Sequence, residues 1–170
     1  MDWKKFRQFL TDKYGVNKAF MFIGYVPEFE SLYEQLHDAG YLIVLKPTFD
    51  MTRVQLTAEE KEQRAKNKDQ AEKDDRPTKG NVDADLVLWA MKEIPNYDKA
   101  IIVSGDGDFY ALIEYLDQQH KLLKLLAPNA HYSGLFNKFE KYIERLDTYK
   151  KDLRYYDHKK RNPKPDGKAK

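Results

Sequence analysis

Four short segments of this chain are apolar at nearly every position, and helical patterns separate them. They are residues 19–26 (AFMFIGYV), 41–47 (YLIVLKP), 100–105 (AIIVSG) and 122–128 (LLKLLAP). A strand whose two faces are both apolar is typical of a parallel sheet that helices cover on both sides. The alternation of such strands with helices therefore predicts an α/β domain with a mostly parallel sheet and right-handed crossovers.

Between these strands, apolar residues recur three or four positions apart, which is the spacing of amphipathic helices. The predicted helices are marked by Phe6–Tyr14, Phe29–Leu36, residues 83–94, Phe109–Leu116 and Leu135–Leu146. The last of these is predicted as one long helix that ends the folded part of the chain.

The length of 170 residues fits one domain, which we predict over residues 1–149. Residues 57–79 contain seven acidic and seven basic residues and almost no apolar side chain, so they are predicted to be a charged insertion outside the core. Residues 150–170 carry nine Lys or Arg against three Asp, which predicts a basic, disordered tail. Such a tail suits a polyanionic partner, although a solvated tail without a partner explains the composition equally well.

Neither the composition nor the N-terminal sequence points to export. The chain has no Cys, which excludes disulfides and thiolate metal sites, and no run approaches the length of a membrane span. The first residues also lack the apolar core of a signal peptide. We therefore expect a soluble, cytoplasmic protein that does not associate with membranes.

Two acidic pairs follow predicted strands or open predicted helices. Asp106 and Asp108 come directly after the strand at residues 100–105, and Asp83 and Asp85 open the next helix upstream. Ligands of parallel α/β sheets gather beyond the carboxyl ends of the strands, where these side chains are expected. A simpler interpretation is an Asp-Gly turn in which Asp108 caps the following helix.

Carboxylates that converge on one edge repel each other unless a cation compensates them. All-oxygen ligation favours Mg²⁺ or Mn²⁺, and the hydroxyl of Ser104 could orient a carboxylate or a water molecule. The four His residues are scattered without ligand spacing, so no zinc site is expected. Because the chain lacks a Walker-type loop and a G-x-S-x-G elbow, metal-assisted phosphodiester hydrolysis fits these residues better than nucleotide hydrolysis or serine chemistry.

The segments KGNVDADLVLWAM and AIIVSGDGDFYALIEYL resemble the NYN-domain proteins, the LabA-like members of the PIN-like nuclease superfamily. The resemblance implies a Rossmann-like three-layer α/β/α domain and a metal-dependent ribonuclease site that uses Mg²⁺ or Mn²⁺. It further implies catalytic roles for Asp83, Ser104, Asp106 and Asp108, the three Asp being the metal ligands. Asp85 is adjacent to a matched position and is a weaker candidate.

One part of the family pattern is absent from this chain. Family members begin with a strand that ends in D-x-x-N and lies in the middle of the sheet, whereas this chain begins at MDWKKFRQFL, which resembles the segment after that strand. Two interpretations remain open: the start of the chain is wrongly set, or the strands at residues 19–26 and 100–105 pair directly. Without that Asp, we expect weak metal binding and little or no cleavage.

RNA is the expected partner, and four basic residues are candidates for contacting it. Lys79 precedes the first acidic pair, while Lys150, Lys151 and Arg154 stand beside tyrosines that could stack on bases. The competing interpretation is that Lys79 is only solvated and that the C-terminal segment packs an apolar face onto the domain. The oligomeric state is not predicted.

Three functions remain open from the sequence. The first is an NYN-type metal-dependent ribonuclease, and the second is a non-catalytic RNA- or protein-binding module of the same fold. A sugar-nucleotide transferase with Asp106 and Asp108 as its metal-binding D-x-D fits less well, because the chain is short for that fold.

Overall fold

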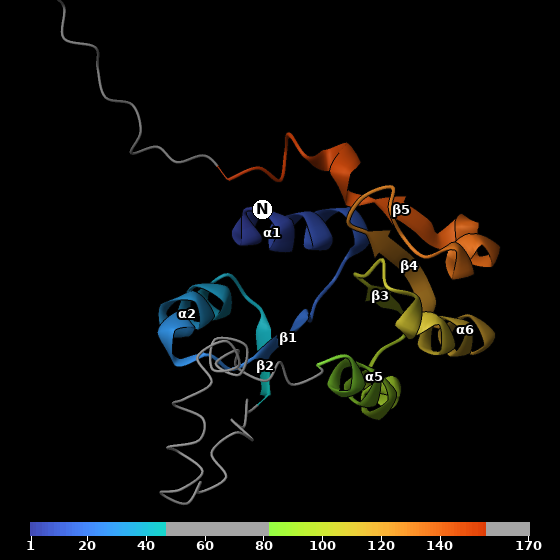
Figure 1. Ribbon diagram of the computed structural model, residues 1–170, viewed down its shortest axis with the longest axis horizontal. Coiled ribbons are helices and arrows are strands. Elements are labelled where there is room, and N and C mark those ends of the chain that lie inside the picture. Colours follow the sequence, from blue (N-terminus) through green and yellow to red (C-terminus); the bar gives the residue numbers. More distant parts are fainter. Residues whose placement is uncertain (47–81, 156–170) are drawn as a thin grey trace, which may run out of the picture.

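The computed structural model describes residues 1–46 and 82–155. The predicted charged insertion at 57–79, which includes Lys79, and residues 156–170 of the predicted tail lie outside the described residues. The described parts form an α/β domain in which the strands are parallel, as the sequence predicts (Figure 1).

The helices and strands alternate along the chain, and the four predicted strands and first four predicted helices are confirmed. The strands are β1 (Phe20–Gly24), β2 (Leu42–Lys46), β3 (Ala100–Ile102), β4 (Leu122–Ala127) and β5 (Ile143–Arg145). The α-helices are α1 (Trp3–Tyr14), α2 (Glu30–Asp38), α5 (Asp83–Lys92) and α6 (Tyr110–Gln118). Short 3-10 helices are η1 (Pro27–Phe29), η2 (Ile94–Asn96), η3 (Gly107–Phe109), η4 (Gly134–Tyr142) and η5 (Leu146–Tyr149).

The prediction of a long helix from Leu135 to Leu146 is wrong. The backbone leaves helical geometry at Phe139, with φ −105° and ψ 17°, and the chain then forms β5 in parallel with β4. Ile143 packs with α6 and η4, whereas Leu146 lies in the cluster around α1. These side chains therefore pack on opposite faces of the sheet. Their spacing in the sequence, which also fits one helix, does not distinguish the two faces.

The strands form two separate sheets, one of β1 and β2 and one in the order β3-β4-β5. Within the described residues β1 and β3 do not pair with each other, so the direct pairing that the sequence left open is not found. The resulting break in the sheet is visible between β1 and β3 in Figure 1.

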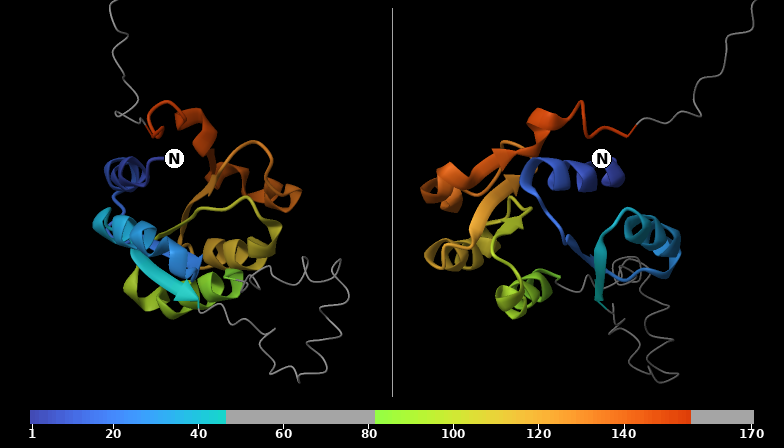
Figure 2. Two further views of the ribbon diagram at one scale, coloured as in Figure 1. Left: turned by 60° about the vertical axis from the view of Figure 1, so that its left-hand side comes forward. Right: turned by 180° about the vertical axis from the view of Figure 1, so that it is seen from behind.

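The core is divided between the faces of the β3-β4-β5 sheet. Leu125 of β4 packs with α6 and η4 on one face, while its neighbour Leu126 packs with Phe6 and Leu10 of α1 on the other. This alternation follows from the pleat of a strand, which directs successive side chains to opposite faces. Figure 2 accordingly shows α1 and α6 on opposite sides of β4, which is the predicted three-layer arrangement.

Helix α1 begins and ends at residues suited to those positions. The side chain of Asp2 accepts a hydrogen bond from the backbone of Lys5, and Gly15 closes the helix in the left-handed conformation at φ 69°. Arg7 donates hydrogen bonds to the backbone carbonyls of Gly40 (3.0 Å) and Asn17 (2.9 Å). Helix α1 is thereby attached to both sheets, since its apolar face packs on β4.

Candidate functional site

Asp106 and Asp108 lie in a segment that we call the acidic loop, residues 103–108. It leaves the carboxyl end of β3 and enters η3 at Gly107. Within it, the backbone N–H of Asp106 donates to Oγ of Ser104 at 3.0 Å, and Oδ1 of Asp106 accepts from the backbone N–H of Asp108 at 3.0 Å. Asp106, rather than Asp108, is therefore the residue that caps the helical turn, which corrects the turn interpretation of the sequence. The cap also fixes the orientation of the Asp106 carboxylate relative to the end of β3.

The acidic loop packs tightly against the loop that follows β4. The backbone N–H of Ser133 donates to the carbonyl oxygen of Gly105 at 2.9 Å. A Cβ atom at Gly107 would lie 2.5 Å from Oγ of Ser133, so only glycine fits there without a shift of its neighbours. Ser133 was not among the residues singled out from the sequence, although Ser-Gly before a helical turn is a capping signal, and its Oγ accepts from the N–H of Leu135.

The second acidic pair opens α5, and this helix packs against η3. Asp83 is the first residue of α5 and is half-buried at the helix N-terminus, where the helix dipole favours a negative charge. Asp85 instead pairs with Lys46, with 3.0 Å between Oδ2 and Nζ. Lys46, at the end of β2, is a partner of this acidic pair that the sequence did not single out.

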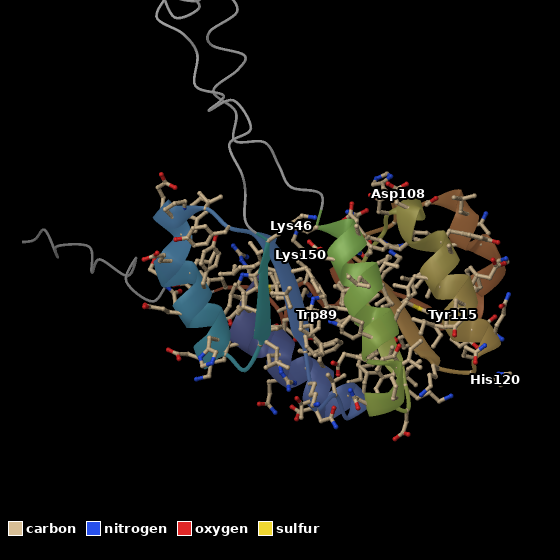
Figure 3. All side chains as sticks on the ribbon, turned by 90° about the horizontal axis from the view of Figure 1, so that it is seen from below. Lys46, Trp89, Asp108, Tyr115, His120 and Lys150 are labelled. Atoms are coloured by element: carbon tan, nitrogen blue, oxygen red, sulfur yellow. The ribbon has the colours of Figure 1, made fainter. Side chains whose placement is uncertain are left out.

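Parallel topology brings these ends to one edge of the molecule. Figure 3 shows Lys46 and Asp108 at the same edge as the start of α5, whereas His120, which precedes β4, lies at the opposite edge. The carboxyl ends of β2 and β3 therefore share an edge although these strands belong to two sheets. The clustering of Asp83, Asp106 and Asp108 at this edge stays a prediction.

The donor set at this edge has the chemistry of a hard divalent cation site. Asp106 and Asp108 are both exposed, and in the described part of the chain no Lys or Arg pairs with either carboxylate. Carboxylate and hydroxyl oxygens suit Mg²⁺ or Mn²⁺. Residues 1–46 and 82–155 nevertheless hold no group of three or more His, Cys, Asp or Glu arranged to bind a metal, so the assembly of Asp83, Asp106 and Asp108 into one centre remains a prediction.

The predicted RNA-contacting residues of the C-terminal segment lie elsewhere. Lys150, Lys151 and Arg154 are exposed, and their segment is fastened to the start of α1, where Lys5 donates to the carbonyl oxygen of Arg154 at 3.2 Å. Leu153 of the same segment is buried in the cluster around α1. The predicted packing of this segment onto the domain is thus confirmed, although in short turns rather than in one helix.

A model of the NYN domain family matches residues 1–147. The chain belongs to the NYN domain family. This family of PIN-like ribonucleases typically uses metal ions, and its fold agrees with the parallel α/β arrangement of this NYN domain. Comparison with curated proteins and with solved structures gave no match.

Among the helices of residues 1–46 and 82–155, none combines the length and the apolar character that a membrane crossing needs. The cytoplasmic location expected from the sequence stays a prediction.

Proposed function

We propose that this NYN domain binds RNA and carries the residues of a metal-dependent site for phosphodiester hydrolysis at the edge formed by the acidic loop and the start of α5. The observation that supports this most is the pair Asp106 and Asp108, exposed and without a cationic partner among the described residues, at the carboxyl end of a parallel strand. Two exposed carboxylates that no protein cation neutralises are suited to a bound metal ion.

Asp83, Asp106 and Asp108 would hold the Mg²⁺ or Mn²⁺ ion. When bound, such an ion lowers the pKa of a coordinated water and neutralises the charge that develops on a phosphate. The chain itself orients one ligand: Oδ1 of Asp106 accepts from the N–H of Asp108, so Oδ2 would be the oxygen that binds a cation. Ser104 accepts from the N–H of Asp106, so its hydroxyl hydrogen remains available to donate to water or a phosphate oxygen.

The basic residues have separate roles in this proposal. Lys46 neutralises Asp85 beside the acidic edge and reduces the repulsion that a phosphate meets there. Lys150, Lys151 and Arg154 attract the RNA backbone from another surface of the domain. Lys79 remains a candidate phosphate contact outside the described residues.

One variant separates metal binding from folding. Asp106→Asn keeps an oxygen that accepts from the N–H of Asp108, and Asn is as good a cap as Asp, so only the charge is lost. We expect Mn²⁺ to raise the melting temperature of the unaltered protein and to leave that of Asp106→Asn unchanged. Asp98→Asn, an exposed carboxylate before β3, is the matched control and should respond like the unaltered protein.

A second candidate function is a non-catalytic RNA- or protein-binding module. It is favoured by the lack of a three-ligand group in the described residues. Hydrolysis requires that the attacking water and the phosphate are closely aligned, since a misplacement of these groups by about 1 Å can cost roughly 100-fold in rate. A domain that binds single-stranded RNA equally well with and without Mn²⁺, and does not cleave it, would identify this alternative, whereas cleavage abolished by Asp106→Asn would establish the nuclease.

A further inference from the structure

The loop after β4, residues 128–133, lies directly against the acidic loop. A Cβ atom at Gly105 would lie 3.4 Å from Cβ of Tyr132 and 3.5 Å from Cδ of Pro128, which is van der Waals contact. The hydrogen bond from the N–H of Ser133 to the carbonyl oxygen of Gly105, at 2.9 Å, fixes the two loops to each other. Tyr132 is thereby held beside the acidic loop by contacts of the backbone.

Two apolar side chains border the acidic loop and remain accessible. Leu135, the second residue of η4, is 57% exposed, and its Cδ1 lies 3.1 Å from the position of a Cβ on Gly107. Tyr132 is half-buried, because it packs against the cluster formed by β3, β4, α6 and η4. The carboxylates of Asp106 and Asp108 therefore have an aromatic and an aliphatic side chain as neighbours in the chain fold.

Arg145 lies at the same edge of the sheet and on the same face. The parallel register pairs Arg145 with Ala127, the last residue of β4, which directly precedes Pro128. Ile143 packs with α6 and η4, and the pleat of β5 directs Arg145, two residues later, to that same face. Tyr132 packs on this face as well. Neighbouring strand ends therefore bring Arg145 and Tyr132 to one side of the sheet.

The guanidinium of Arg145 is held in one orientation and keeps donors to spare. Its Nε and Nη2 donate to the carboxylate of Asp147 at 3.0 Å and 2.6 Å. These hydrogen bonds and the charge of Asp147 raise the pKa of Arg145, and Tyr132 adds to the effect. Nη1 has no acceptor among the described residues, and the side chain is 44% exposed. The remaining N–H groups suit a phosphate oxygen.

We propose that Tyr132, Leu135 and Arg145 form a nucleotide subsite beside the acidic loop. In this subsite a base of the RNA stacks on the ring of Tyr132, with Leu135 as its apolar border, and a phosphate of the same strand binds Arg145. Aromatic rings beside cationic side chains are the usual means of holding a nucleic acid strand. Stacking on Tyr132 requires a base that is not stacked in a duplex, so the bound nucleotide is unpaired.

This inference rests on the proposed function, because the subsite positions the strand whose phosphate faces Asp106 and Asp108. Its three residues are positioning residues, since they hold the RNA while the carboxylates serve the hydrolysis. The test therefore measures binding without cleavage, in the full chain carrying Asp106→Asn. This substitution keeps the cap on the N–H of Asp108 and removes the charge that the metal ion needs.

Photo-crosslinking identifies the residue on which the base lies. The probe is a single-stranded RNA of about ten nucleotides that carries 5-iodouridine, a length within the usual range of such sites. After irradiation, we expect mass spectrometry to find the crosslink on Tyr132. Tyr115 is also exposed, but Figure 3 shows it farther along α6 toward His120, and it should stay unmodified.

Affinity for the same RNA separates stacking from other effects. Tyr132→Phe keeps the ring and should bind like the parent chain, whereas Tyr132→Ala should lose about 5- to 150-fold in affinity. Tyr115→Ala is the matched control and should lose nothing. Because Tyr132 is half-buried, binding is measured well below the melting temperature of Tyr132→Ala. Leu135→Ser, at an exposed position, should lose about threefold.

The phosphate contact is measured through its salt dependence. Each phosphate contact on a single strand contributes about 0.7 to the slope of log K against log salt concentration. Arg145→Met should therefore reduce this slope by about 0.7, and Arg145→Lys should retain most of it. Lys99→Met is the control, because Lys99 bonds to the carbonyl of His120 at the opposite edge, and it should leave the slope unchanged.

The outcomes distinguish the subsite from the proposed function. Equal affinity of Tyr132→Ala and Tyr132→Phe, or a crosslink on Tyr115 instead of Tyr132, overturns the subsite while RNA binding and the proposed function stand. A chain that binds no RNA overturns both. A crosslink on Tyr132 together with no cleavage by the unaltered protein supports the subsite and rejects the nuclease function.

Discussion

Replacing Gly107 by Ala tests how closely the acidic loop fits the loop after β4. The added Cβ would lie 2.5 Å from Oγ of Ser133, 3.1 Å from its Cβ and 3.1 Å from Cδ1 of Leu135. Overpacking of this kind typically costs about 1–3 kcal/mol, against a gain of roughly 0.4–1 kcal/mol from the stiffer unfolded chain. We expect Gly107→Ala to lower the free energy of unfolding by about 1–2 kcal/mol in urea denaturation.

Gly134→Ala is the control for this substitution. Its new Cβ would have only Nδ2 of Asn137 as a neighbour, at 4.0 Å, and its backbone is not left-handed. We expect a change within about 0.5 kcal/mol, or a small gain in stability.

Ser133→Gly supplies the decisive comparison, because it removes both Ser133 atoms that the new Cβ meets. A glycine in the capping position costs only a few tenths of a kcal/mol. The double variant Gly107→Ala, Ser133→Gly should therefore be more stable than Gly107→Ala alone, with a coupling of about 1 kcal/mol. Strict additivity, or a Gly107→Ala variant as stable as Gly134→Ala, would refute the close fit of these loops.

Two further predictions concern charged pairs. Burial opposes ionisation of Glu144, but hydrogen bonds from Lys13 and nearby tyrosines lower its pKa from 4.5 to about 2. The stability that Glu144 contributes is therefore present above pH 4.5 and is lost as the pH falls toward 2. Glu144→Gln should make the unfolding free energy depend less on pH in this acid range, and an unchanged slope would contradict this. Lys46→Met removes the 3.0 Å ion pair with Asp85. Because both side chains are about a third exposed, we expect a loss of at most about 1 kcal/mol in stability, together with weaker RNA binding at low salt. Unchanged RNA binding would show that Lys46 does not belong to the proposed site.

Local patterns determined most of the elements of this domain. Runs such as residues 100–105 and 122–128 are apolar on both faces, and glycine ends α1, so the order of strands and helices and their parallel arrangement follow from neighbouring residues alone. The position of Asp106 at a strand end follows in the same way. The sequence did not predict β5, because Ile143 and Leu146 fit both a helical spacing and a strand with its following turn.

The tertiary structure decided what residues distant in the chain do to one another. Ser133 meets Gly107, and Lys46 meets Asp85, only because parallel strands bring their carboxyl ends to one edge from separate parts of the chain. That β1 and β3 do not pair with each other in residues 1–46 and 82–155 is also a tertiary property, since a strand's own sequence does not specify which neighbour supplies its hydrogen bonds. Periodicity reports which side chains are apolar, whereas pairing depends on the free energy of contacts between distant segments.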